Sequence, residues 1–222
     1  MKFGFIGAGK VGFSLGKYLA DNNQNVVGYY SIINEEAIEA AKFTGSKYYE
    51  NMEQLVEDSE VLFLTVPDGQ IENLWNQLKS SHKNWMAKYN KPLLNNKIVC
   101  HCSGALSSDI FSSIAEYESF GYSIHPLFAV SNRYESYKEL SDSYFTIEGN
   151  IEKINKMKEL FGENKLQVYA SIAEYLKEKD LPVNKEYSQT IETAMLEVSN
   201  VINAYLKPEE YEWNPAETLL EQ

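Results

Sequence analysis

The 222-residue chain is long enough for one or two domains with a sizeable core, since 44% of its residues are hydrophobic. Its 32 acidic and 20 basic side chains give a net charge of −12, which argues against nucleic acids and anionic membranes as partners. No apolar run is long enough to span a bilayer, and the amino-terminal segment has the pattern of a strand rather than a signal peptide. Cys100 and Cys102 are poorly placed to bridge, so we expect a reducing, cytoplasmic environment.

The chain begins with a glycine motif between a predicted strand and a predicted helix. Residues 2–6 form a short apolar run suited to a buried parallel strand, and Gly7, Gly9 and Gly12 follow in the spacing G-x-G-x-x-G. An apolar residue then recurs every four positions, as on the buried face of a helix. This is the context that the dinucleotide fingerprint requires: Gly7 for the tight turn, Gly9 for close approach of a pyrophosphate, and Gly12 for helix packing. The alternative is a glycine-rich turn without a ligand. The predicted cofactor-binding residues are Gly7, Ala8, Gly9, Lys10, Val11 and Gly12.

The second predicted strand, residues 25–30, ends without the acidic residue that usually accepts a hydrogen bond from the cofactor's ribose 2′-hydroxyl. The first acid, Glu35, already belongs to the next predicted helix, residues 35–43. Ser31 and Asn34 can donate hydrogen bonds to a phosphate, although no arginine is nearby in the sequence. The pattern therefore favours NADP over NAD. The alternative is that Ser31 and Asn34 only cap the helix.

A third short strand is predicted at residues 47–49 and a clear fourth strand at 60–66. Ligands of open α/β sheets lie beyond the carboxyl ends of the strands, so Val66 and Pro67 belong to the expected cofactor cleft. Asp68 either caps a helix over residues 70–78 or faces the ligand. The polar residues 80–97 are expected to form an irregular surface excursion.

Two further predicted strands, residues 97–102 and 122–125, end in side chains that can carry chemistry. Ser103 could orient a nicotinamide or a substrate, or simply cap the helix expected after it. His125 could donate or accept a proton, or brace the loop before Pro126. The run Cys100-His101-Cys102 lacks enough further ligands at workable spacing, so we predict no metal site.

Two fragments, combined with the glycine motif, carry a resemblance to a known family. The fragments 101–106, HCSGAL, and 125–127, HPL, resemble Rossmann-like proteins with the domain of unknown function numbered 2520. Residues 144–150 match the strand that follows in that family. More distantly the chain is similar to pyrroline-5-carboxylate reductases, deazaflavin-dependent NADP oxidoreductases and prephenate dehydrogenases. The resemblance covers residues 1–170 and implies a nicotinamide-cofactor domain followed by a helical, often dimerising, domain.

The carboxyl-terminal part is expected to be helical, with an apolar stripe along residues 186–206 that suits a core or a dimer interface. We therefore predict a doubly wound, mostly parallel α/β Rossmann domain, residues 1–149, and a small, shortened helical domain, residues 150–222. The expected function is that of a homodimeric NAD(P)-dependent oxidoreductase acting on a small-molecule substrate, with Ser103 and His125 at the active centre. A nucleotide-binding sensor without turnover is the alternative, because no partner acid is assignable to His125 and the helical domain is shortened, with no histidine after His125.

Overall fold

The computed structural model describes residues 1–162 except 142 and 144. The predicted helices beyond residue 162, including the apolar stripe at 186–206, lie outside the described residues. The domain boundary at residue 149 therefore remains a prediction.

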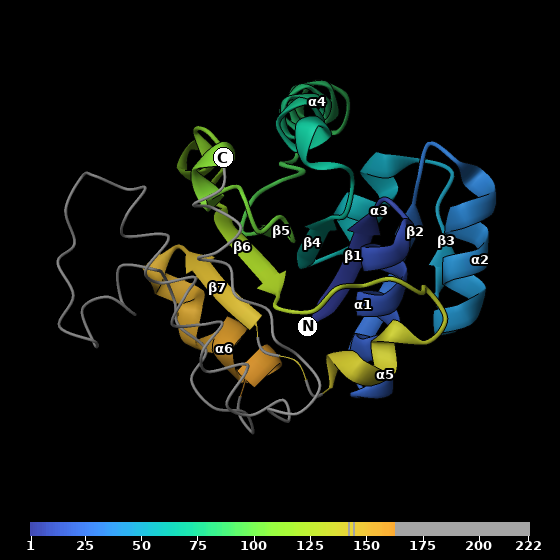
Figure 1. Ribbon diagram of the computed structural model, residues 1–222. Coiled ribbons are helices and arrows are strands. Elements are labelled where there is room, and N and C mark those ends of the chain that lie inside the picture. Colours follow the sequence, from blue (N-terminus) through green and yellow to red (C-terminus); the bar gives the residue numbers. More distant parts are fainter. Residues whose placement is uncertain (142, 144, 163–222) are drawn as a thin grey trace, which may run out of the picture. The chain divides into compact units, whose positions relative to one another are not determined.

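A single sheet organises the described part of the chain (Figure 1). Its seven strands have the order β3-β2-β1-β4-β5-β6-β7, and all neighbours are parallel except the antiparallel pair β6 and β7. The predicted doubly wound, mostly parallel Rossmann sheet is thus confirmed. The strands are β1 (Lys2–Ile6), β2 (Asn25–Tyr30), β3 (Lys47–Tyr48), β4 (Val61–Leu64), β5 (Ile98–His101), β6 (Phe120–Pro126) and β7 (Phe145–Gly149).

Helices cover both faces of the sheet. The central strands β1, β4 and β5 are therefore buried on both sides. One apolar cluster packs α1, α2, α5 and α6 on one face, and a second packs α3, α4 and the turns around Phe111 on the other. The helices are α1 (Lys10–Asp21), α2 (Asn34–Thr44), α3 (Met52–Asp58), α4 (Asp68–Tyr89), α5 (Ser136–Leu140) and α6 (Ile154–Gly162), with short 3₁₀ helices η1 (Ser108–Ile110), η2 (Ile114–Tyr117) and η3 (Ile151–Lys153). Within these residues no helix has the length and apolar character needed to span a bilayer.

The strand order reverses at β1, which is flanked by β2 on one side and β4 on the other. Such a switch point opens a crevice beyond the carboxyl ends of the two central strands, where open α/β sheets bind their ligands. The glycine turn follows β1 and the segment from Thr65 to Pro67 follows β4. The topology thus places both predicted cofactor segments at this crevice.

Two sequence-based predictions, for residues 80–97 and for the segment after Leu106, were wrong. The expected surface excursion at 80–97 is helical over its first ten residues, since α4 continues to Tyr89 and ends only at Asn90, a left-handed residue with φ 52°. One packed stripe, which includes Trp75 and Leu78, is enough to hold this otherwise polar helix on the sheet. The single helix expected after Leu106 is replaced by η1 and η2, because Ser113 and Glu118 adopt left-handed conformations that interrupt an α-helix.

Candidate functional site

The glycine turn joins the carboxyl ends of β1, β2 and β4. Gly7 has φ +102°, and a Cβ atom there would lie 2.5 Å from the backbone oxygen of Thr65, so only glycine fits. The Gly7 N–H donates a hydrogen bond to the carbonyl of Tyr30 at 2.8 Å. Thr65 in turn donates its backbone N–H to Ile6 and its hydroxyl to the Gly7 carbonyl. Three strand ends are therefore held together at the turn.

The other two glycines have different surroundings. A Cβ on Gly12 would lie 2.3 Å from Thr65 Oγ1 and 2.8 Å from the Gly7 carbonyl oxygen, so this glycine allows α1 to pack close to the strand ends. Among the residues that the structure describes, nothing lies within 4 Å of the place that a Cβ on Gly9 would take. The space beside Gly9 is therefore open, as the approach of a ligand to the backbone requires.

Helix α1 begins beside this open space with an end suited to an anion. Gly9 is its N-cap and supplies no side-chain cap, and its first turn contains no acidic residue. The N–H groups of a helix's first turn have no partner within the helix, and they carry the positive end of its dipole. Of the other predicted residues in the turn, Ala8 is buried, Val11 is partly buried and Lys10 is exposed.

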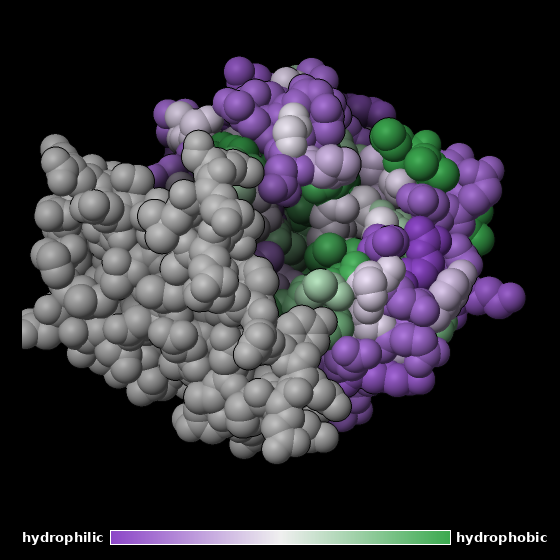
Figure 2. All heavy atoms as spheres, in the orientation of Figure 1, coloured by the Kyte–Doolittle hydropathy of each residue, from purple (hydrophilic) through white to green (hydrophobic). Residues whose placement is uncertain are grey.

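The predicted ribose end lies where β2 passes into α2. Ser31 is buried, and its hydroxyl oxygen accepts a hydrogen bond from the Ile33 N–H at 3.2 Å. The residue that caps α2 is Ile33, without a side-chain hydrogen bond, so the proposed capping by Ser31 and Asn34 was wrong. Asn34 is exposed as the first residue of the helix. Figure 2 shows hydrophobic surface at this turn, where Ile32 is 91% exposed.

At the end of β4, Val66 is partly buried and Pro67 is exposed. The N-cap of α4 is Pro67, so of the two alternatives for Asp68 the capping role was wrong. Asp68 is instead the first residue of the helix, and its Oδ2 accepts a hydrogen bond from the Ser103 hydroxyl at 2.7 Å. This bond links the ends of β4 and β5.

Ser103 has one hydrogen-bonding direction left for a ligand. Its proton is committed to Asp68, and its oxygen also accepts the Ala105 N–H at 3.1 Å. A hydroxyl oxygen has two lone pairs, so within the described part of the chain one lone pair of this buried serine is left for a donor such as an amide NH₂. The alternative of a simple helix cap does not hold, because η1 begins only at Ser108 and is capped by Ser107.

His125 lies next to Ser103, at the end of β6. Its Nδ1 is 2.9 Å from the carbonyl oxygen of Cys102. A carbonyl can only accept, so Nδ1 carries a proton and the neutral ring keeps the lone pair on Nε2. That nitrogen is 2.8 Å from where a Cβ on Gly104 would lie, so a glycine at this position leaves room for the ring. The structure thus brings Asp68, Ser103 and His125 together from three strand ends.

His101 was not assigned a role from the sequence, yet it supports this loop. Its Nδ1 accepts the Ser103 N–H at 3.2 Å and its Nε2–H donates to the Ser107 carbonyl at 3.2 Å. Burial lowers the pKa of His101, which keeps the ring neutral and fit to accept as well as donate. Burial also raises the pKa of the neighbouring Cys100 thiol. No group of three or more metal-ligating side chains lies close together among the described residues.

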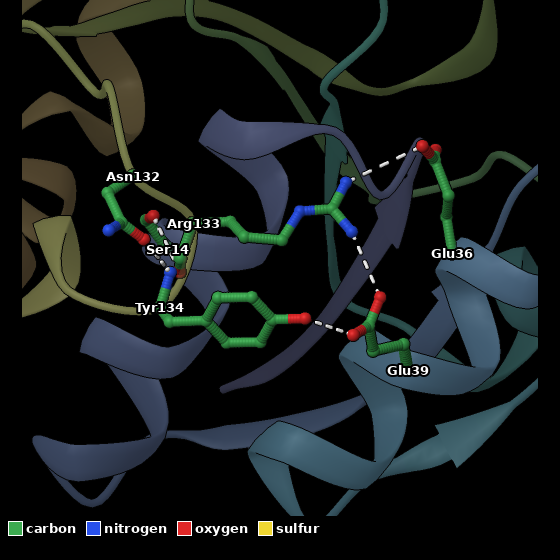
Figure 3. A network of polar contacts seen from close by, with 6 residues as sticks. All are labelled: Ser14, Glu36, Glu39, Asn132, Arg133 and Tyr134. Atoms are coloured by element: carbon green, nitrogen blue, oxygen red, sulfur yellow. Dashed lines mark hydrogen bonds and ion pairs between the residues drawn. The ribbon is translucent and has the colours of Figure 1, made fainter.

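Arg133 also lies near the ribose end, although the sequence separates it widely from β2. Its guanidinium pairs with Glu36 and Glu39 on α2 (Figure 3). Sequence inspection missed it because the chain returns to α2 only after β6, and no local pattern signals that return.

The comparisons with known proteins agree with this geometry. A family model described as a Rossmann-like domain matches residues 1–126. The Bacillus subtilis (strain 168) protein named "Putative 6-phosphogluconate dehydrogenase YqeC" is 35% identical over 75 residues, which are 32% of this chain and 25% of that protein. The chain therefore matches about a quarter of the length of this curated relative.

Two solved structures share the fold. "Putative NADP oxidoreductase BF3122" from Bacteroides fragilis has a TM-score of 0.56 at 17% identity and covers 97% of this chain and 84% of its own. The imine reductase BcSIRED from Bacillus cereus BAG3X2 has a TM-score of 0.57 at 12% identity and covers 90% and 64%. Because the family model matches 126 of the 222 residues, the chain belongs to the Rossmann-like domain family.

Proposed function

We propose that this protein is an NADP-dependent oxidoreductase that acts on a small molecule. The observation that carries the proposal is the open space at Gly9, beside the uncapped start of α1 and at the switch point of the sheet. The names of the related proteins support it, since they include a 6-phosphogluconate dehydrogenase, an NADP oxidoreductase and an imine reductase.

The residues present fit a dinucleotide at each of its parts. The first turn of α1 would hold the pyrophosphate, and the β2–α2 turn around Ser31 would hold the adenosine ribose. The exposed Ile32 offers apolar surface to the flat nucleoside there. Val66 and Pro67 would line the path toward Ser103. When bound, NADP supplies a hydride acceptor or donor, and the protein supplies binding, orientation and electrostatics.

The cluster at the ends of β4, β5 and β6 favours turnover over nucleotide sensing alone. The free lone pair of Ser103 would orient a donor group of the nicotinamide or the substrate. His125, with Nδ1–H held by Cys102, would take or give a proton at Nε2. Asp68 keeps the Ser103 hydroxyl in one orientation. These are the groups that a reaction at a carbonyl or imine centre needs beside its cofactor.

The experiment that tests the proposal is a thermal unfolding series without nucleotide, with NADH and with NADPH. A ligand at 100 times its dissociation constant stabilises the folded state by about 2.7 kcal/mol. We expect NADPH to raise the unfolding temperature more than NADH at equal concentration. Absence of any shift with either nucleotide would remove the proposal.

Replacing Ser31 by aspartate should reverse the cofactor preference. The carboxylate would be placed near the 2′-phosphate, and two unit charges ~4 Å apart repel by about 4 kcal/mol at an effective dielectric constant of about 20. After screening we expect at least about a tenfold loss of NADPH affinity, with NADH affinity retained or improved. Titration calorimetry with both nucleotides measures this. Ser31→Asn is the matched control, because it adds similar volume without charge; a preference for NADH in the unmutated protein contradicts the idea.

We also propose that the protein is a cytoplasmic homodimer. The two free cysteines suit a reducing compartment, and the apolar stripe at residues 186–206 suits a two-fold seam. Light scattering at micromolar concentration should give twice the chain mass, and Ile191→Lys should halve it by placing an unpaired charge in the seam. A monomer mass for the unmutated protein would refute the dimer.

A further inference from the structure

The chain contains a single arginine, Arg133, and the fold brings it to the ribose end of the predicted cofactor site. It belongs to residues 127–135, which we call the crossing segment. This segment leaves the end of β6, runs past α1 and enters α5, and it is the yellow stretch in Figure 1. It therefore connects the strand that carries His125 with the helices beside Ser31.

The guanidinium of Arg133 faces α2. Its Nη1 lies 3.0 Å from Glu39 Oε2 and its Nη2 lies 3.5 Å from Glu36 Oε1. The cation also lies 5.2 Å from the centre of the Phe13 ring, in the first turn of α1. Figure 3 shows the side chain extended across the gap between the two helices. Because 23% of the side chain is exposed, a ligand at this end can reach it.

The backbone that carries Arg133 is fixed by contacts that do not involve its charge. The Ser14 hydroxyl donates to the Arg133 carbonyl at 3.3 Å, and the Tyr134 N–H donates to Asn132 Oδ1 at 2.9 Å. The Tyr134 ring packs edge-on against Phe13, and its hydroxyl donates to Glu39. The guanidinium can thus exchange partners while the crossing segment stays in place.

Of the two acids that Arg133 contacts, Glu36 lies in the first turn of α2, directly after the Ser31 turn, and Glu39 lies about one helical turn further along. The Glu36 N–H donates to the Ile33 carbonyl at 3.2 Å, and the Ile33 N–H donates to Ser31 Oγ at 3.2 Å. Glu36 is the third residue after Ile33, which corresponds to a rise of about 4.5 Å along the helix axis. Arg133 is thus paired with an acid in the first turn of α2, directly after the turn at which the ribose is expected.

We propose that Arg133 recognises the 2′-phosphate of NADP, an assignment that rests on the proposed function. NADP-binding Rossmann domains accommodate this phosphate with an arginine near the end of β2, and residues 26–41 contain neither arginine nor lysine. Arg133 fills the role from a distant part of the chain. Its planar fork matches a phosphate with two parallel hydrogen bonds, which are stronger than the half-exposed pairs it makes with Glu36 and Glu39.

The two glutamates oppose a phosphate at this position, so selectivity for the phosphate depends on Arg133. Without Arg133, Glu36 and Glu39 would leave only negative charge beside α2 and would repel a phosphate. With Arg133 between them, the phosphate finds one cation held at the correct side of the helix. The nucleotide that lacks the 2′-phosphate gains nothing from this cation, so the arginine should act on NADPH alone.

The experiment measures the affinities of the full chain for NADPH and NADH by titration calorimetry. Arg133→Gln should weaken NADPH binding by at least about tenfold, the loss of a charged bidentate pair, and leave NADH unchanged. Arg133→Lys keeps the positive charge but loses the planar fork, so its NADPH affinity should lie between those of the unmutated protein and of Arg133→Gln. Lys138→Gln is the matched control, because it removes an exposed positive charge on α5 that pairs with Glu135, and it should change neither affinity.

Tyr134→Phe separates recognition from anchoring, because it removes one tie between the crossing segment and Glu39 and keeps the charge and the fork of Arg133. It should leave the ratio of the two affinities unchanged. An Arg133→Gln protein that keeps its NADPH preference, or loses both affinities equally, would overturn the assignment and leave Arg133 as an anchor. If the unmutated chain binds neither nucleotide, the proposed function itself falls and this assignment with it.

Discussion

Replacing Gly9 by valine should leave the protein folded and abolish its stabilisation by nucleotide. Gly9 has φ −67° and ψ −176°, an extended conformation that any residue adopts, and a Cβ there would meet nothing within 4 Å. The branched side chain therefore costs the free protein little. It would occupy the space through which the backbone approaches a pyrophosphate.

The expected signal is large enough to measure by thermal unfolding. A nucleotide at 100 times its dissociation constant adds about 2.7 kcal/mol, which corresponds to about 5–10 °C for a chain of this size. Gly9→Val should show none of this shift. Gly12→Ala is the contrasting variant, since its Cβ would lie 2.3 Å from Thr65 Oγ1 and should lower the unfolding temperature without any ligand. A folded Gly9→Val protein that still responds to nucleotide would place the pyrophosphate elsewhere.

Replacing His125 by asparagine should lower the rate of hydride transfer by about 10²–10⁴-fold, the usual contribution of a positioned acid or base. The asparagine amide can still donate to the Cys102 carbonyl, so the loop keeps its main contact. It lacks the titratable Nε2, and the proton must then come from solvent. Nucleotide affinity should stay unchanged, because the phosphates are expected at the start of α1.

The rate is measured by following NADPH oxidation in single turnovers with a panel of carbonyl and imine compounds. His82→Asn provides the matched control, since His82 lies on α4 and accepts the Leu94 N–H, well away in the sequence from the strand ends. It should not alter the rate. If His125→Asn turns over as fast as the unmutated protein, His125 only braces its loop.

The central part of the fold was predictable because its signals are local. The glycine spacing, the apolar strand that precedes it and the apolar run ending at Pro67 each specify an element within about a dozen residues. β1 and β2 accordingly have the predicted bounds, Lys2–Ile6 and Asn25–Tyr30. The carboxyl ends of parallel strands necessarily share one edge of the sheet, so the grouping of Ser103 with His125 followed from topology.

The remaining details depend on contacts between distant parts of the chain. Nothing around Asp68 indicates that its carboxylate accepts from Ser103 rather than capping α4. The full length of α4 was missed because its second half is polar and carries too few apolar positions to show a helical period. Arg133 was missed because its contacts also join distant parts of the chain: the strands β3 to β6 lie in the sequence between α2 and Arg133.

The length of the crossing segment couples the position of Arg133 to the position of His125. Only seven residues, 126–132, lie between His125 and Arg133, and the match to the Rossmann-like family ends at the first of them, Pro126. An insertion or deletion in this stretch would shift the arginine relative to α2 while pulling on the strand end that carries the histidine. Exchange of the same stretch between relatives, at constant length, would transfer the cation without touching the glycine turn. On the proposed assignment, nucleotide preference is set by a loop that lies outside the residues matched by the Rossmann-like family.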